Sequence, residues 1–260
     1  MSPTTTDLIQ SESKDGILTL RINRPDKKNA LNLVMYQALA DGLRKADGDD
    51  TVRVILISGT GDCFTSGNDL ADFLTTPPTG LDSPVMQFLT AISAARKPIV
   101  AAVNGLAVGV GVTMLLHCDL AYAGRSTTFQ MPFVNLGLCP EAGSTLLLPL
   151  IMGHQRAAEL LLLGENFSAE KACALGIVTA VCADADVQSV ARTKSLQLAA
   201  QPAAAVRLAK NLLKRDYAAK LRETIEEEGK QFMERLKSPE AAEALQAFME
   251  RRKPDFTQFS

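Results

Sequence analysis

The sequence lacks tryptophan, has only two histidines, and carries a net charge of only −2 over 260 residues. A balance this close to neutral gives no electrostatic attraction for nucleic acid, so we expect no nucleic-acid partner. The five cysteines have no C-x-x-C spacing, and with so few histidines no metal site is expected. Their odd number offers no disulfide framework, which favours a reducing, cytoplasmic environment.

The sequence also shows no targeting or membrane segment. Its first residues lack the basic and apolar regions of a secretory signal, and its last three are not the peroxisomal tripeptide. Residues 98–117 are almost uncharged and long enough to suggest a membrane span. Asn104 and several glycines interrupt this stretch, which favours a buried strand, a glycine turn and a buried helix. We therefore expect no membrane partner.

The composition that is present, 47% apolar and 22% charged, is typical of a globular protein with a substantial core. Apolar and polar residues alternate at 17–23, which predicts a half-buried strand, and Asn32 opens a helical pattern that ends near Gly48. Further strands are expected at 52–58, 98–103 and 120–123. Because helices are expected between these strands, the sequence predicts an α/β fold around a largely parallel sheet.

The second half of the chain has a different pattern. After residue 143 it becomes helical, with a short strand expected at 177–181 and amphipathic helices from 186 nearly to 254. The expected helices before that strand span 144–152, 155–163 and a segment capped by Ser168. Residues 75–84 are a loop by composition, which either covers a site or simply connects two elements.

Two segments carry glycines where a strand is expected to give way to a helix. In residues 62–70, free backbone N–H groups would bind an anion or a developing oxyanion, whereas the simpler interpretation is a helix cap by Asn68 or Asp69. In residues 103–113, glycines follow a strand without the G-x-G-x-x-G or P-loop spacing. Close backbone packing and ligand approach both explain them.

A third segment, residues 132–145, places Glu141 after Pro140 in apolar surroundings. One interpretation is a glutamate in the first turn of a helix, stabilised by the helix dipole. The other is a carboxylate base without a counter-ion. Burial would raise its pKa and a helix N-terminus would lower it, and the sequence does not decide between them.

Taken together and in this order, these segments resemble the signatures of the crotonase (enoyl-CoA hydratase/isomerase) superfamily. The resemblance covers nearly the whole chain and rests on five stretches: R-P-D-K-K-N-A-L-N at 24–32, F-T-S-G-N-D-L at 64–70, A-V-N-G-L-A-V-G-V-G at 102–111, L-G-L-C-P-E-A-G at 136–143 and A-C-A-L-G-I-V at 172–178.

The resemblance implies a spiral core of ββα units over residues 1–195 and a C-terminal helical region over 196–260, which forms a homotrimer that is often doubled to a hexamer. It implies an acyl-CoA substrate, with coenzyme A as part of the substrate and no separate cofactor. The implied oxyanion hole consists of the backbone N–H groups of Ser66 and Val110. The implied CoA contacts are Lys27, Lys28, Ser66, Gly67, Asn68, Asp69 and Leu70.

Departures from the family pattern indicate the subgroup. The two positions at which enoyl-CoA hydratases carry glutamates read Thr113 and Phe133 here, and neither side chain activates water or supplies a proton well. Hydratase activity is therefore disfavoured, and both residues become candidate pocket residues.

Glu141 matches the catalytic glutamate of Δ3,Δ2-enoyl-CoA isomerases, where one carboxylate moves a proton from C2 to C4. We therefore expect such an isomerase, with a role in fatty acid β-oxidation. Two alternatives remain: another crotonase activity, either enoyl-CoA hydration or isomerisation of a ring-epoxide CoA thioester in aromatic catabolism, and a non-catalytic acyl-CoA-binding protein. The intact Glu141 and both oxyanion segments argue against the latter.

Overall fold

The computed structural model describes residues 8–75 and 80–259, so part of the predicted loop at 75–84 lies outside the described residues. Six strands form the main sheet in the order β1-β2-β3-β4-β6-β9. They are β1 (Ile9–Lys14), β2 (Ile17–Ile22), β3 (Val54–Gly59), β4 (Ile99–Val103), β6 (Leu120–Gly124) and β9 (Ala180–Cys182). Among the described strands of this sheet, only β1 and β2 pair antiparallel, which confirms the predicted, largely parallel sheet.

The strand β1 was not predicted, because only the first of its six residues is buried and its sequence is polar. A second sheet of three strands, in the order β5-β7-β8, was also not predicted. Its strands are β5 (Leu106–Val108), β7 (Thr128–Gln130) and β8 (Phe167–Ser168). Strands of two or three residues are too short to show a periodic pattern.

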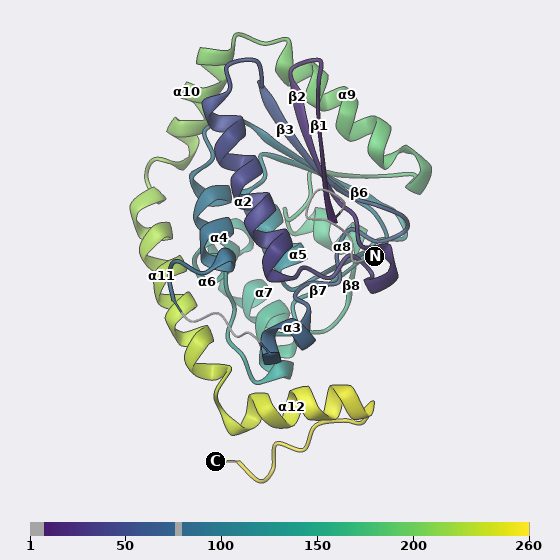
Figure 1. Cartoon of the computed structure of the whole chain (residues 1–260), viewed down its shortest axis with the longest axis vertical. Coiled ribbons are helices and arrows are strands. Elements are labelled where there is room, and N and C mark those ends of the chain that lie inside the picture. Colours follow the sequence, from purple (N-terminus) through teal and green to yellow (C-terminus); the bar gives the residue numbers. More distant parts are fainter. Residues whose placement is uncertain (1–7, 76–79, 260) are drawn as a thin grey trace.

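Helices cover both faces of the main sheet (Figure 1). In β3, Ile55 and Ile57 belong to the large core that also contains the buried residues of α2 (Leu33–Gly48) and α4 (Pro84–Ala94). The alternate residues, Val54 and Leu56, pack instead with α9 (Val187–Ala199). The two-residue period of a strand therefore gives this sheet two buried faces.

The remaining helical elements lie mainly after the sheet's fifth strand, as the sequence predicts. The α-helices are α3 (Leu70–Thr75), α5 (Val110–Thr113), α6 (Ser144–Met152), α7 (His154–Ala158), α8 (Ala169–Ala174), α10 (Ala203–Lys214), α11 (Ala218–Arg235) and α12 (Pro239–Glu250). Short 3₁₀ turns are η1 (Pro25–Lys27), η2 (Met114–His117), η3 (Val134–Leu136) and η5 (Asp184–Asp186), and η4 (Glu159–Leu163) is a π-helix.

Two local signals in the sequence are confirmed by their hydrogen bonds. The Asn32 side chain accepts from the Met35 N–H at 2.9 Å and begins α2, and Ser168 caps α8 by accepting from the Lys171 N–H at 3.2 Å. The uncharged stretch at 98–117 forms β4, β5, α5 and η2. Within the described residues, no helix is long and apolar enough to cross a membrane.

Two features of the C-terminal part bear on the site. The predicted boundary at residue 195 falls inside α9, which packs on the main sheet, and the division into two domains stays a prediction. The helix α11 contacts both α4 and α6 (Figure 1). The C-terminal helical region therefore packs against two helices of the core region.

Candidate active site

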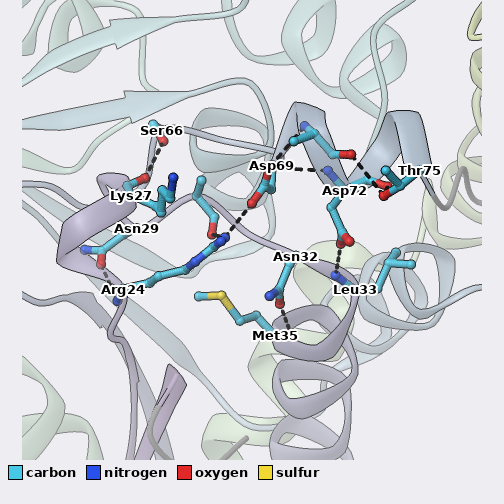
Figure 2. Close-up of polar contacts among 12 residues, drawn as sticks. Arg24, Lys27, Asn29, Asn32, Leu33, Met35, Ser66, Asp69, Asp72 and Thr75 are labelled. Carbon is cyan, nitrogen blue, oxygen red and sulfur yellow. Dashed lines mark hydrogen bonds and ion pairs between the residues drawn. The ribbon is translucent and has the colours of Figure 1, made fainter. Parts of the chain in front are cut away.

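The first two sequence motifs lie against each other (Figure 2). Arg24 Nη1 forms an ion pair with Asp69 Oδ2 at 2.7 Å, and the other oxygen of Asp69 accepts from the Ala71 N–H at 3.1 Å. Asp72 Oδ2 accepts from the Leu33 N–H at 2.8 Å. Asp69 therefore caps α3, as the simpler interpretation of this segment proposed, and also binds the motif at 24–32.

Lys27 and Lys28, expected to contact CoA, are exposed beside the second motif. The Ser66 side chain donates to the Lys27 carbonyl at 3.5 Å (Figure 2), and the Ser66 backbone N–H donates to the Lys28 carbonyl at 3.0 Å. The structure thus brings together the lysines and the segment 66–70 that the sequence assigned to one CoA site.

The same contact corrects one prediction. Because the Ser66 N–H is bonded to Lys28, it is not available as an oxyanion donor. Among residues 64–69, the N–H groups of all members but Asn68 have a partner in the described part of the chain. Both neighbours of Asn68 bond across to Leu31, which leaves the Asn68 N–H as the free donor of this motif.

The third motif offers a second free donor. The Val108 N–H donates to the Thr65 carbonyl at 3.1 Å, so this segment runs beside the second motif. A Cβ at Gly67 would lie 2.8 Å from the Val108 carbonyl oxygen, so only glycine permits this approach. At the start of α5, the Val110 N–H has no partner among the described residues, in agreement with its predicted role.

Glu141 lies in a turn that precedes α6, and is therefore not a residue of the helix. It is buried at 6% exposure and accepts a hydrogen bond from the Thr113 hydroxyl. Burial raises the pKa of Glu141 to about 8, the hydrogen bond from Thr113 opposes this rise, and the charge of Glu228 adds to it. Of the two effects that the sequence left open, burial therefore dominates.

The turn itself has an unusual backbone. Ala142 has φ 62° and Gly143 has φ 72°, both in the left-handed region. For alanine this conformation costs about 1–2 kcal/mol, and it persists only where neighbours hold it. Because a carbonyl oxygen only accepts, His117 Nε2 carries the ring proton and donates to the Ala142 carbonyl at 2.8 Å. Burial lowers the pKa of His117 to about 3, so the ring is otherwise neutral.

A narrow, mostly apolar cavity joins Glu141 to the second motif. Asn68 lines it together with Glu141, and the remaining wall comes from α4 and α11, through Val85, Met86, Gly229, Phe232 and Met233. The Tyr36 hydroxyl donates to Asn68 Oδ1 from the buried side. Burial and, second, the charge of Glu141 raise the pKa of Tyr36 well above its usual value, so the phenol stays protonated.

The two residues at hydratase glutamate positions, which the sequence suggested as pocket residues, are both buried, and neither is among the residues that line this cavity. Thr113 holds Glu141, as described, and the Phe133 ring lies 3.9 Å from the position that a Cβ would take at Gly109. Sequence reasoning missed three further residues, Tyr36, Glu228 and His117. No local pattern marks them, because each reaches the site from a segment far away in the sequence.

The fold agrees with the relatives of the chain. The enoyl-CoA hydratase/isomerase family matches residues 12–259, and the chain belongs to this family. Among solved structures, that of Pseudomonas aeruginosa OdaA superposes with a TM-score of 0.92 at 51% identity and covers 94% of this chain and 100% of that one. The crotonase-type α/β fold with a C-terminal helical region is thereby confirmed.

Two curated relatives differ in activity. Human enoyl-CoA delta isomerase 2 is 36% identical over 247 residues, which are 92% of this chain and 62% of that protein, so the chain spans less than two thirds of its length. The 1,2-epoxyphenylacetyl-CoA isomerase of Escherichia coli (strain K12) is 35% identical over 259 residues, covering 96% of this chain and 98% of that protein.

Proposed function

We propose that this protein is an acyl-CoA isomerase that shifts the double bond of a 3-enoyl-CoA to the 2-position. The observation that carries the proposal is one buried carboxyl group, Glu141, which lines the same apolar cavity as Asn68. A group that removes and returns a proton works best when its pKa lies near the working pH, and burial raises the pKa of Glu141 to about 8.

The reaction needs one base and one oxyanion site. The Glu141 carboxylate removes a proton from C2, and the electron pair spreads over the thioester and the C3–C4 double bond as a dienolate. The Asn68 and Val110 N–H groups stabilise its oxygen, each worth about 2.7–4 kcal/mol in sites of this kind. Glu141 then returns the proton to C4, which leaves the double bond between C2 and C3. No cofactor is required beyond the CoA carried by the substrate.

The residues around Glu141 favour isomerisation over hydration. Thr113 and Phe133 place no second carboxylate at the site, and hydration normally divides water activation and proton delivery between two. The Thr113 hydroxyl orients Glu141, and the mostly apolar side chains that line the cavity keep it dry, which favours proton return to the same substrate.

The rest of the proposal concerns CoA binding, the cellular environment and the oligomeric state. Lys27 and Lys28 provide positive charge for CoA phosphates, and the segment Ser66–Leu70 lies beside them. We assign the protein to fatty acid breakdown in a reducing, cytoplasmic environment, a setting in which its five free cysteines are stable. We also propose a homotrimer or hexamer as its working form.

A second candidate function is isomerisation of a ring-epoxide CoA thioester. It is favoured by the similarity to the Escherichia coli 1,2-epoxyphenylacetyl-CoA isomerase over 98% of that protein. The same oxyanion donors and the same carboxyl group serve such a reaction. A binding protein without catalysis remains the third alternative.

The deciding experiment compares wild type with Glu141→Gln on a 3-enoyl-CoA, following conjugation of the product, and on a 2-enoyl-CoA, following water addition. We expect fast migration by wild type, a loss of at least about 10³-fold in the variant, and little hydration by either. Binding of a saturated acyl-CoA should persist in Glu141→Gln. If wild type binds acyl-CoA but leaves the 3-enoyl-CoA unchanged, the isomerase proposal is wrong, and turnover of the epoxide would identify the second candidate.

A further inference from the structure

Glu228, on α11, is a buried carboxyl group that the proposed reaction does not use. Only 7% of the residue is exposed. Its partners among the described residues are hydrogen-bond donors at the start of α6, and none of them carries a positive charge. A carboxyl group is seldom buried in this way without a cationic partner.

Glu228 binds the end of the turn that carries Glu141. Its Oε2 accepts from the Gly143 N–H at 2.6 Å. Its Oε1 accepts from the N–H and from the hydroxyl of Thr145, at 3.0 Å and 2.5 Å. Because α6 begins at Ser144, the Gly143 and Thr145 N–H groups have no partner within the helix, and Glu228 accepts from both at the positive end of the helix dipole. Glu228, and not Glu141, therefore caps this helix.

The helix that carries Glu228 also shapes this turn. A Cβ on Gly143 would lie 2.3 Å from the Leu221 side chain, so α11 rests directly against the left-handed backbone. On the opposite side, Ala142 is held by His117. The turn is therefore held by η2 through His117 and by α11 through Glu228, which accepts one hydrogen bond from the turn and two from Thr145 at the start of α6.

The charge of Glu228 also acts on Glu141. Three other titratable groups face the turn: Tyr36 from α2, His117 from η2 and Cys139 just before it. Near neutral pH all three are uncharged, because burial raises the pKa of Tyr36 well above its usual value, lowers that of His117 to about 3 and raises that of Cys139 to about 11. Burial also raises the pKa of Glu228 itself, while the hydrogen bonds from Thr145 and Gly143 oppose that rise and favour its charged form. Among these neighbours, Glu228 is the group whose charge acts on Glu141.

We propose that Glu228 is a positioning residue for the proposed reaction: it holds the left-handed turn that presents Glu141 to the cavity, and its negative charge favours the protonated form of Glu141. The proposal rests on the proposed function for its effect on turnover. Its effect on the proton affinity of Glu141 does not depend on any substrate.

The test measures that proton affinity directly. Protein labelled with ¹³C at the glutamate carboxyl carbons is titrated by NMR, and the Glu141 signal is identified by its loss in Glu141→Gln. In Glu228→Gln, removal of the charge stabilises the Glu141 carboxylate, so we expect its midpoint to move to lower pH by roughly one unit. Glu227→Gln, the same change at the exposed neighbouring position, should leave the midpoint in place. An unmoved midpoint in folded Glu228→Gln overturns the inference.

Glu228→Asp separates position from charge and serves if the glutamine variant does not fold. It keeps the charge on a shorter side chain that does not reach both Gly143 and Thr145. We expect a midpoint close to that of wild type and a fall in kcat of roughly tenfold with KM little changed. Wild-type kcat in this variant would contradict the positioning role. If the wild type isomerises no 3-enoyl-CoA, the proposed function fails, and the glutamine titration still decides whether Glu228 acts on Glu141.

Discussion

Neither position at which hydratases carry a glutamate holds a carboxylate here, because these positions are Thr113 and Phe133. Thr113 stands where hydratases carry a glutamate, and in the structure its hydroxyl donates to Glu141. In the proposed reaction, this position therefore supports the one base. Its hydrogen bond lowers the pKa of Glu141 and so opposes the effect of burial.

We predict that Thr113→Val lowers isomerase turnover at pH 7 by about tenfold. Without the hydroxyl, the pKa of Glu141 rises further above about 8, so less carboxylate is present at neutral pH. The acidic limb of the pH–kcat profile should move to higher pH, with partial recovery of turnover under alkaline conditions. Thr19→Val on β2 is the matched control. A lower but unshifted profile would show that Thr113 does not act through the proton affinity of Glu141.

At the scale of elements, α2 contributes more than core packing. Asn32 caps its start, which places Tyr36 in the first turn with its ring fully buried, 5.5 Å from the Phe88 ring between centroids. The hydroxyl at the end of that ring bonds the Asn68 side chain. Through Tyr36, the helix α2 therefore holds the side chain of Asn68, whose backbone N–H is the first proposed oxyanion donor.

We predict that Tyr36→Phe reduces kcat about fivefold to tenfold with little change in KM. The ring and its packing remain, but Asn68 loses a buried hydrogen bond, worth about 1 kcal/mol, that fixes its position. Steady-state kinetics on a 3-enoyl-CoA measure the effect. Tyr122→Phe on β6 removes a hydroxyl elsewhere in the fold and should behave as wild type. Equal losses in both variants would point to a general effect on stability.

On the scale of the whole molecule, one C-terminal helix lines the cavity and another exposes apolar side chains on the surface. The helix α11 lines the cavity and holds the Glu141 turn through Glu228. The preceding helix α10 exposes three large apolar side chains, Leu208, Leu212 and Leu213, the last at 79%. Apolar side chains exposed on one helix are typical of a surface that a partner covers.

We predict that the protein forms a homotrimer or hexamer at micromolar concentration, because association removes these leucines from water. Light scattering coupled to size-exclusion chromatography gives the mass directly. Leu213→Glu, at the most exposed of the three positions, should shift the population toward smaller species, whereas Leu81→Glu, an exposed leucine outside the C-terminal helices, should not. A monomeric wild type would contradict the proposal.

Much of the fold follows from local patterns in the chain. Alternation predicts β2, a cap at Asn32 predicts α2, and Ser168 predicts α8. Strands of two or three residues, such as those of the second sheet, carry too few positions for a period to emerge and were missed. In the site, the roles that the motifs assign to Glu141 and Val110 stay predictions, and the motifs wrongly placed the other donor at Ser66, whose N–H is bonded, two residues before the free N–H of Asn68.

That error has a physical reason. Which backbone N–H is free depends on which carbonyl lies opposite, and the Lys28 carbonyl that binds Ser66 comes from another segment. The sequence by itself determined the family, the order of the motifs and the single carboxylate of the site, because these depend on residue identity and spacing. Only the tertiary structure decided which donors are free, how far Glu141 is buried, and that Tyr36, His117 and Glu228 surround it, because contacts between distant segments leave no periodic trace in the chain.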